Sequence, residues 1–347
     1  MNSVADKKLR RDVYSAVARK SADYSTKQIA RSSSPYQDKS MPQSLLVRLS
    51  KVKVLRKFAG KPFLAANEWV CNRLPASLTA ALPMYSYNAF IHSLVELRAE
   101  RKQYHGTFFL RNRPELELIR TLASKCAQGS TLNLTVLACS NGAEVYSIVW
   151  TIRSARPDLK VTVNAIDVST EILEIAKKGV YSLQTDKLVD APIFERLTEA
   201  EMEALFEREK DQFKIKACIK EGINWELEDA GDPELARRLG PQDIVLANRF
   251  LCHMAPPDAE QCLRSLARLV RPGGYLFVSG IDLDIRTKVA IDSGWTPVPD
   301  LLEEIHNGDP SVRRDWPWRY WGLEPFNRNR RDWPVRYASV FQLGHQA

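Results

Sequence analysis

The chain has 347 residues, of which 44% are hydrophobic and 27% charged. These values are ordinary for a soluble globular protein and allow one large or two modest domains with an ample core. The sequence shows no long apolar run and no apolar signal-peptide region, which argues against a transmembrane segment and favours a cytoplasmic protein. Six scattered cysteines without metal-ligand spacing predict free thiols in a reducing compartment.

The net charge of +8 is concentrated at one end of the chain. Residues 1–60 hold 14 Lys or Arg and 4 Asp or Glu, whereas the remainder holds 36 and 38. The segment 1–43, rich in Ser, Lys and Arg, is therefore predicted to be a disordered basic arm. Such an arm is either a solubilising tail, which we favour, or a docking segment for an acidic partner, a membrane surface or RNA. The near-neutral remainder argues against a nucleic-acid partner.

Residues 44–104 are predicted to form a helical N-terminal region. The run SLLVRLSKVKVLRKF alternates apolar and basic residues, which is typical of an amphipathic helix. Two further helical stretches are separated by Pro75 and Pro83, since proline ends a helix.

The stretch from Leu132 to Ser182 predicts the first half of a doubly wound α/β sheet. An alternating apolar strand, Leu132–Ala138, breaks at small and turn-forming residues and leads to a helix with one apolar face. A second strand, Val161–Ile166, ends in Asp167 and is followed by a second helix. This order of elements is that of nucleotide-binding α/β folds.

Asp167 suits a nucleoside ligand, because a carboxylate at the tip of the second strand can hold two ribose hydroxyls. The first turn contains one glycine and the chain has no GxxxxGK[ST] loop, so a pyrophosphate is not favoured. S-adenosylmethionine is a nucleoside without phosphates and fits this pattern. The alternative is that Asp167 merely caps the helix that begins at Ser169.

The following segments supply further strands. Residues 188–210 are charged and predicted to be helical, and residues 213–219 alternate as in a strand. Further strands are expected at Ile223–Leu227, Asp243–Leu246 and Tyr275–Ser279, the last after a tight turn at residues 271–274.

Several motifs together resemble the CheR-type chemotaxis methyltransferases. ACSNGAEVYS is similar to their first motif and AIDVSTEILEIAKKGVYS to their second, and the likeness continues through DIVLANRFLCHM and VRPGGYLFVSG. It spans roughly Thr107 to Gly280, and several motifs in order are far more specific than one. The resemblance implies a Rossmann-like, seven-stranded methyltransferase sheet with a small antiparallel insertion, in an S-adenosylmethionine-dependent domain at 105–347.

The resemblance also implies the site residues. The candidates for cofactor binding follow the successive strands: Ala138, Ser140, Gly142, Glu144, Asp167, Val168, Asp229, Ala230, Asn248 and Arg249. Asp229 stands where an acid can accept a hydrogen bond from the adenine amino group, although the family is expected to have an amide there. HGTFFLRNRPELELIRT is similar to the Thr-x-Phe-Phe-Arg segment that lies against the cofactor. Arg111 is therefore the candidate arginine near the cofactor, with Arg113 as the alternative.

The motif at residues 247–254 departs from the family pattern. Asn248-Arg249 inverts the family's Arg-Asn order, and His253 replaces a tyrosine beside the transferred methyl group. A carboxylate acceptor needs no base, whereas a hydroxyl or amine acceptor does, and histidine has a suitable pKa. His253 is therefore a candidate catalytic base. The alternative is a packed core histidine.

The last 67 residues lie outside the resemblance and hold five of the eight tryptophans. DLLEEIHNGD predicts a helix ended by Asn307-Gly308, and VRYASVFQL predicts the closing strand of the sheet. The aromatic stretch at about 281–333 is predicted to be an insertion in the final hairpin. It forms either a tryptophan-rich minicore over the sheet or a lid or substrate wall.

These features predict an S-adenosylmethionine-dependent methyltransferase that acts on a carboxylate or hydroxyl oxygen of a protein side chain or small molecule. In-line displacement requires mainly alignment and a dry pocket. The alternative function is a non-catalytic module that holds the cofactor or a peptide. A nucleic-acid methyltransferase is disfavoured by the neutral body and by the missing Asn/Asp-Pro-Pro-Tyr/Phe signature. No metal site is predicted.

Overall fold

The computed structural model describes residues 106–182, 193–308 and 326–344, with a few isolated residues between 63 and 87. The chain divides into two compact units, Met1–Leu45 and Leu46–Ala347, and every described residue belongs to the second. The predicted basic arm and almost all of the predicted helical region at 44–104 lie outside the described residues. Within the described part of the chain, no helix is long and apolar enough to cross a membrane.

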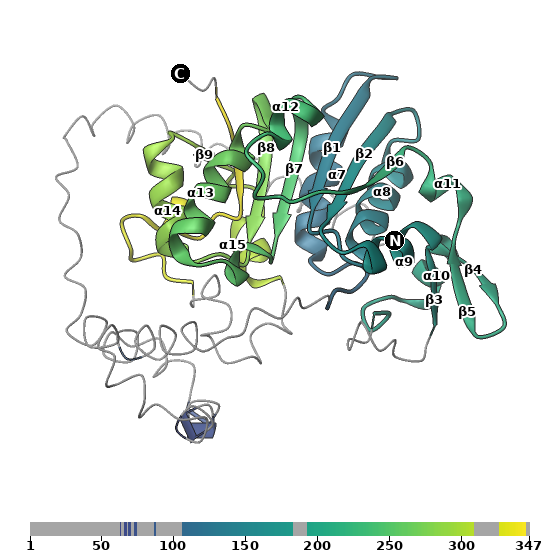
Figure 1. Cartoon of the computed structure of the whole chain (residues 1–347), viewed down its shortest axis with the longest axis horizontal. Coiled ribbons are helices and arrows are strands. Elements are labelled where there is room, and N and C mark those ends of the chain that lie inside the picture. The colour runs from purple at the N-terminus through teal and green to yellow at the C-terminus, as the bar shows by residue number, and fades with distance from the viewer. Residues whose placement is uncertain are drawn as a thin grey trace, which may run out of the picture. The chain divides into compact units, whose positions relative to one another are not determined.

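A seven-stranded sheet forms the centre of the described domain (Figure 1). In spatial order its strands are β6 (Ile223–Leu227), β2 (Lys160–Asp167), β1 (Thr131–Leu137), β7 (Gln242–Asn248), β8 (Val270–Ser279), β10 (Val340–Gln342) and β9 (Thr296–Pro297). The first five are mutually parallel, and β10 runs antiparallel to both of its neighbours. The predicted doubly wound α/β sheet is thereby confirmed.

The strand order reverses direction at β1. From β1 the chain winds outward through β2 to β6 on one side and then returns to β7 on the other. In such a sheet the loops after the two central strands diverge and leave a crevice at the carboxyl edge. The segments after β1 and β7, residues 138–142 and 249–254, are therefore placed to hold a ligand.

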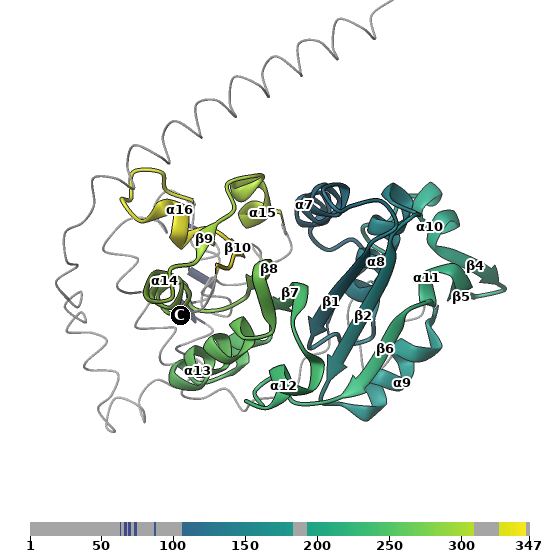
Figure 2. The ribbon, with the colours of Figure 1, turned by 90° about the horizontal axis from the view of Figure 1, so that it is seen from above.

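Helices cover both faces of the sheet and create two cores (Figure 2). One face carries α7 (Arg113–Ser124), α8 (Ala143–Ala155) and α15 (Leu302–Asn307), and the other carries α12 (Leu235–Leu239) and α13 (Pro256–Ala267). Further helices are α9 (Thr170–Lys178), α14 (Leu283–Asp292) and α16 (Trp333–Arg336). Successive residues of a strand point to opposite faces. In β1, Leu134 and Val136 accordingly enter the first core and Leu137 the second.

The small antiparallel insertion implied by the resemblance is a separate three-stranded sheet, ordered β3 (Val180–Ser182), β5 (Gln212–Ile215) and β4 (Phe206–Glu209). The short helices α10 (Glu199–Leu205) and α11 (Ala217–Lys220) flank it. Rings of Phe109, Tyr181, Phe194, Phe206 and Phe213 pack edge to face or offset, with neighbouring centroids 5.0 to 6.4 Å apart. This aromatic cluster fixes the segment before α7 against the insertion.

Three predicted elements were wrong in extent. Of the predicted helix at 188–210, the described residues are helical only in α10, since residues 193–198 precede it without helical structure. Residues 206–209 form β4, because Phe206 joins the aromatic cluster and draws the chain into the small sheet. The predicted strand at 213–219 ends at Ile215, and α11 follows. The predicted closing strand at residues 335–343 is shorter than expected. Its first two residues belong to α16, and only Val340–Gln342 pairs as a strand.

The predicted tight turn at residues 271–274 was also wrong. β8 runs through it, with a register shift against β7 that accommodates the extra residues. Gly274 allows this close approach, since a Cβ there would lie 2.9 Å from the Asp243 carbonyl oxygen. The prolyl-glycyl run is thus a bulge in a long strand.

The helix ended by Asn307-Gly308 is confirmed as α15, which has Gly308 at its C-cap. The closing hairpin of the sheet is the antiparallel pair β9 and β10. The predicted insertion at 281–333 does not coincide with its connection, because residues 283–292 form α14 ahead of β9 and only residues after Pro297 join the two strands. Residues 309–325, with three of the insertion's tryptophans, lie outside the described residues.

Gly280 tests the packing at the end of β8. Its φ is +62°, and a Cβ would lie 2.6 Å from the Cα of Arg249. Gly280→Ala is expected to lower the free energy of unfolding by about 3 kcal/mol, from backbone strain and this clash together. Gly294 has φ +64° with open space around it, so Gly294→Ala is the matched control and should cost about 1 kcal/mol. Urea denaturation measures both, and equal losses would contradict the close approach.

Candidate cofactor site

Strained backbone surrounds the crevice. Among the described residues, six non-glycine residues have positive φ, and four of them gather at this site: Leu110, Ala138, Ser140 and Arg249. Each costs about 1–3 kcal/mol unless its surroundings hold it, and such residues concentrate at ligand sites. Ala138 and Ser140, with φ of 50° and 52°, form the turn between β1 and α8. Gly142, with φ of 86°, is the N-cap of α8 and completes the turn.

Asp167 locks this turn to the tip of β2. One of its carboxylate oxygens, Oδ2, accepts a hydrogen bond of 2.8 Å from the Ser140 N–H, and Oδ1 accepts one of 3.1 Å from the Ser169 N–H. The side chain of Ser169, in turn, caps α9 by accepting from the Ile172 N–H. Asp167 is therefore not the helix cap itself. Each of its oxygens keeps acceptor capacity, because a carboxylate has about four lone-pair sites.

An apolar surface lies beside Asp167. Asp167 pairs with Leu227 across β2 and β6, and the residues Val168 and Leu227 are 51% and 55% exposed. Exposed aliphatic side chains next to a carboxylate suit a flat base joined to a sugar. Asp229 is exposed, and its Oδ1 accepts from the Gly231 N–H in a local turn, while Ala230 is buried.

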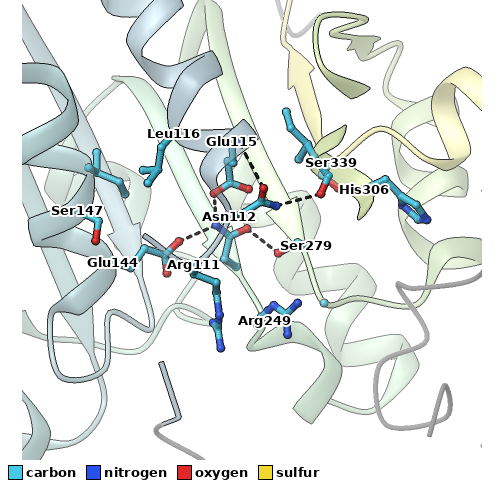
Figure 3. Close-up of a pocket in the computed structure, with 14 residues that line it drawn as sticks. Arg111, Asn112, Glu115, Leu116, Glu144, Ser147, Arg249, Ser279, His306 and Ser339 are labelled. Carbon is cyan, nitrogen blue, oxygen red and sulfur yellow. Dashed lines mark hydrogen bonds between the residues drawn. The ribbon is translucent and has the colours of Figure 1, made fainter. Parts of the chain in front are cut away.

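A polar network lies on the other side of β1 (Figure 3). The Asn248 side-chain amide donates to Oε1 of Glu115 at 2.9 Å and to Oε1 of Glu144 at 2.7 Å. Its oxygen accepts from the Ser279 hydroxyl at 2.7 Å. Both amide hydrogens of Asn248 are thus used, so in this structure Asn248 positions the two carboxylates.

Glu115 has a perturbed acidity. Burial and the nearby Glu144 carboxylate raise the pKa of Glu115 to about 8, against the opposing effects of Asn248, Arg249 and Arg111. A buried carboxyl beside a second carboxyl holds its proton, because two like charges at close range in a low dielectric are unfavourable. Glu115 is therefore largely protonated at neutral pH.

A pocket with a volume of about 40 Å³ joins these groups. This volume is room for a few water molecules and not for a nucleoside. Its polar lining consists of Arg111, Asn112, Glu115, Glu144, Ser147, Asn248, Arg249, Ser279, His306 and Ser339. Carboxylates and arginines face the same small space, as the two charges of an amino-acid group require.

The two candidate arginines are separated by their contacts. Arg113 forms a two-point ion pair with Glu201, at 2.7 and 2.8 Å, and donates to the Arg196 carbonyl oxygen. It links α7 to α10. Arg111 instead lines the pocket, donates to the Gly106 carbonyl oxygen at 3.0 Å and lies over the Phe108 ring. Of the two, the geometry favours Arg111.

His253 lies outside the pocket that contains Glu144. It ends the short 3₁₀ helix η1 (Leu251–His253), and its side chain is exposed. Partial desolvation by its neighbours lowers the pKa of His253 below the usual value. The imidazole is therefore mainly neutral at pH 7, the form that accepts a proton. The alternative of a packed core histidine does not fit this exposure.

Sequence reasoning missed Glu115 and His306. Glu115 stands three residues after Asn112, the N-cap of α7, so its sequence position suggests a capping box. Asn112 does accept from the Glu115 N–H, but the Glu115 side chain turns to Asn248 instead. His306 is buried at the end of α15 against Tyr337. No local pattern marked it.

The described residues hold no group of His, Cys, Asp and Glu side chains that could bind a metal ion.

Comparison with known proteins places this geometry in a family. Residues 105–283, just over half of the chain, match the family described as "CheR methyltransferase, SAM binding domain". A Pseudomonas aeruginosa protein named "Probable biofilm formation methyltransferase WspC" is 26% identical over 186 residues, which cover 53% of this chain and 42% of that protein. A "Chemotaxis protein methyltransferase" of Vibrio parahaemolyticus is 27% identical over 165 residues, covering 46% of this chain and 57% of that protein. The chain thus spans about half the length of these relatives.

Among solved structures, the magnesium protoporphyrin IX methyltransferase ChlM of Synechocystis PCC 6803 with bound SAM overlaps 71% of this chain and 86% of that chain. The TM-score is 0.31 and the identity 12%, too distant to inform on function.

Glu115 should also make the stability of the protein depend on pH. Its pKa is about 8 in the folded protein and near 4.3 when unfolded, so the unfolded chain loses the proton first as pH rises. The free energy of unfolding should therefore fall between pH 5 and pH 8, by on the order of 3 kcal/mol.

Urea unfolding of wild type and Glu115→Gln across this range measures the effect, and the variant should lose the decline. Glu117 is exposed on the same helix, so Glu117→Gln is the control and should behave as wild type. A decline that persists in Glu115→Gln would assign the titration to another group.

Proposed function

Because the chain belongs to the CheR methyltransferase family, we propose that it transfers a methyl group from S-adenosylmethionine to an oxygen atom. The acceptor oxygen is a carboxylate or hydroxyl of a protein side chain or small molecule. The observation that carries this proposal is a site with two chemically different ends, one on each side of β1. Asp167 beside Val168 and Leu227 forms one end, and Glu144 with Arg111 forms the other.

These ends fit the two parts of the cofactor. Asp167 would accept hydrogen bonds from the ribose hydroxyls, with Val168, Leu227 and Ala230 against the base and Asp229 near its amino group. Glu144 and Arg111 would take the ammonium and carboxylate of the amino-acid part, with Asn248 and Arg249 supporting them. The bound cofactor supplies an electrophilic methyl group on sulfur.

The protein's own part in the reaction is alignment and exclusion of water. The turn of Ala138, Ser140 and Gly142 is held by the Ser140–Asp167 hydrogen bond, in which both partners belong to the protein. Preorganised geometry lowers the entropic cost of bringing donor and acceptor into line. His253, at the end of η1 beyond β7, is the proposed base that removes the proton from a hydroxyl acceptor.

A non-catalytic module that holds the cofactor or a peptide is the second candidate. The carboxylates of Glu144 and Asp167 do not distinguish this module from an enzyme, since cofactor binding needs them in both cases. Transfer of a labelled methyl group to any acceptor separates the two candidates.

Asp167→Asn tests the cofactor site. The substitution keeps the shape of the side chain but removes the charge that strengthens hydrogen bonds to the ribose, and it replaces one of the two oxygens that accept from the Ser140 and Ser169 N–H groups. Calorimetric titration with S-adenosylmethionine and S-adenosylhomocysteine should show binding weakened by about ten- to a hundredfold. Asp211 is exposed in the turn between β4 and β5, so Asp211→Asn is the control and should bind as wild type. Unchanged binding in Asp167→Asn would reject this site.

Two measurements together identify the acceptor class: the kcat of His253→Gln and the stability of the labelled product in alkali. With a hydroxyl acceptor, kcat should fall by on the order of 100-fold or more, and the labelled product should survive alkali. With a carboxylate acceptor, kcat should stay within about twofold, and alkali should release the label as methanol. An alkali-stable product formed at the wild-type rate by His253→Gln would exclude His253 as the base.

A further inference from the structure

Glu115 is a buried acid that the proposed methyl transfer leaves unused. It lies in the first turn of α7, is 5% exposed and lines the same pocket as Glu144 in the first turn of α8. The Oε1 atoms of the two residues are at most 5.6 Å apart, since they lie 2.9 and 2.7 Å from one Asn248 nitrogen. One small cation can therefore contact both carboxyl groups.

The Glu115 carboxyl has few hydrogen-bond donors with which to stabilise a negative charge. Within the described residues it accepts one hydrogen bond, from the Asn248 amide, whose other hydrogen serves Glu144. An ionised carboxylate can accept about four. Within the described part of the chain, the one hydrogen-bond donor to Glu115 also serves Glu144, and two carboxylates at this distance disfavour ionisation of both.

The titratable groups around Glu115 lie on several neighbouring elements and have opposing effects on its ionisation. Glu144 on α8 opposes its ionisation, whereas Arg111 ahead of α7 and Arg249 after β7 favour it. His306 on α15 lines the same pocket. Together with burial, these groups favour the protonated form and raise the pKa of Glu115 to about 8.

We propose that Glu115 is a second carboxylate for the ammonium group of the cofactor's amino-acid part, and that it releases its proton when this ammonium binds. The proposal rests on the proposed cofactor and adds a residue and a proton to its binding. The Glu115 O–H bond breaks, the proton passes to solvent, and the resulting carboxylate pairs with the ammonium without covalent bond formation. The ammonium offers three N–H donors, which Asn248 alone cannot match for two carboxylates.

The proposal predicts how many protons are released when the cofactor binds. At pH 7, binding of S-adenosylhomocysteine to the wild type should release about one proton, because Glu115 changes from mainly protonated to ionised. Between pH 6 and 7.5, the Kd should fall by up to about tenfold per pH unit. The range ends at 7.5 because α-amino groups themselves titrate near pH 8.

Calorimetry in buffers of different ionisation enthalpy, such as phosphate and Tris, measures the proton count. In Glu115→Gln, which keeps the acceptor oxygen for Asn248, the count should fall to near zero and the Kd should be nearly independent of pH. In Glu117→Gln, the exposed control, both should match wild type. A full proton released by Glu115→Gln would overturn the assignment.

A second ligand tests the inference in the wild type alone, without reliance on a variant that folds. 5′-Methylthioadenosine carries the nucleoside and thioether but no amino-acid group, so it should bind without proton release. Equal proton counts for the two ligands would overturn the inference and leave the cofactor site intact. Absence of binding by both ligands and by S-adenosylmethionine would instead reject the proposed function itself.

Discussion

The side-chain amide of Asn248 connects four elements at the carboxyl edge of the sheet. It lies at the end of β7, donates to Glu115 of α7 and Glu144 of α8, and accepts from Ser279 of β8. An amide has two N–H donors and one oxygen, and all three are engaged. Two carboxylates from different helices are thereby brought to one point, and the charge left between them can be balanced only by a proton, the nearby arginines or a cationic ligand.

The backbone around this point is held in unfavourable conformations by its surroundings. Ser140 is left-handed so that its N–H reaches Asp167, and Arg249 is left-handed where Gly280 leaves no side chain in the way. Both arrangements join a loop after one central strand to the strand beside it. The folded core supplies the free energy for this strain, which fixes the shape of the edge where the cofactor is proposed to bind.

The proposed cofactor site has chemically different groups on the two sides of β1. Toward β2 and β6, Asp167 lies beside exposed aliphatic side chains, and toward β7 and β8 lie carboxylates and arginines around a small polar pocket. A ligand with a sugar and base at one end and a zwitterion at the other matches this division. The aromatic cluster under the small sheet fixes the segment before α7, and with it Arg111 and Glu115, at the polar end.

The sequence by itself determined the alternation of strands and helices from Leu132 to Gly280, the carboxylate at the tip of β2 and the family motifs, because periodicity, turn residues and motif order are local properties. It misplaced Phe206, whose side chain packs in an aromatic cluster with residues far away along the chain, and the turn at Gly274, where the backbone of Asp243 leaves no room for a Cβ. Only the tertiary structure showed that Arg111 lines the pocket whereas Arg113 pairs with Glu201, and that Glu115 lies in the same pocket. Its position as the third helical residue after Asn112 predicts a cap, but its acidity arises from Glu144 and Asn248, which are 29 and 133 residues away along the chain. Burial and charge pairing depend on neighbours in space, which a local pattern does not contain.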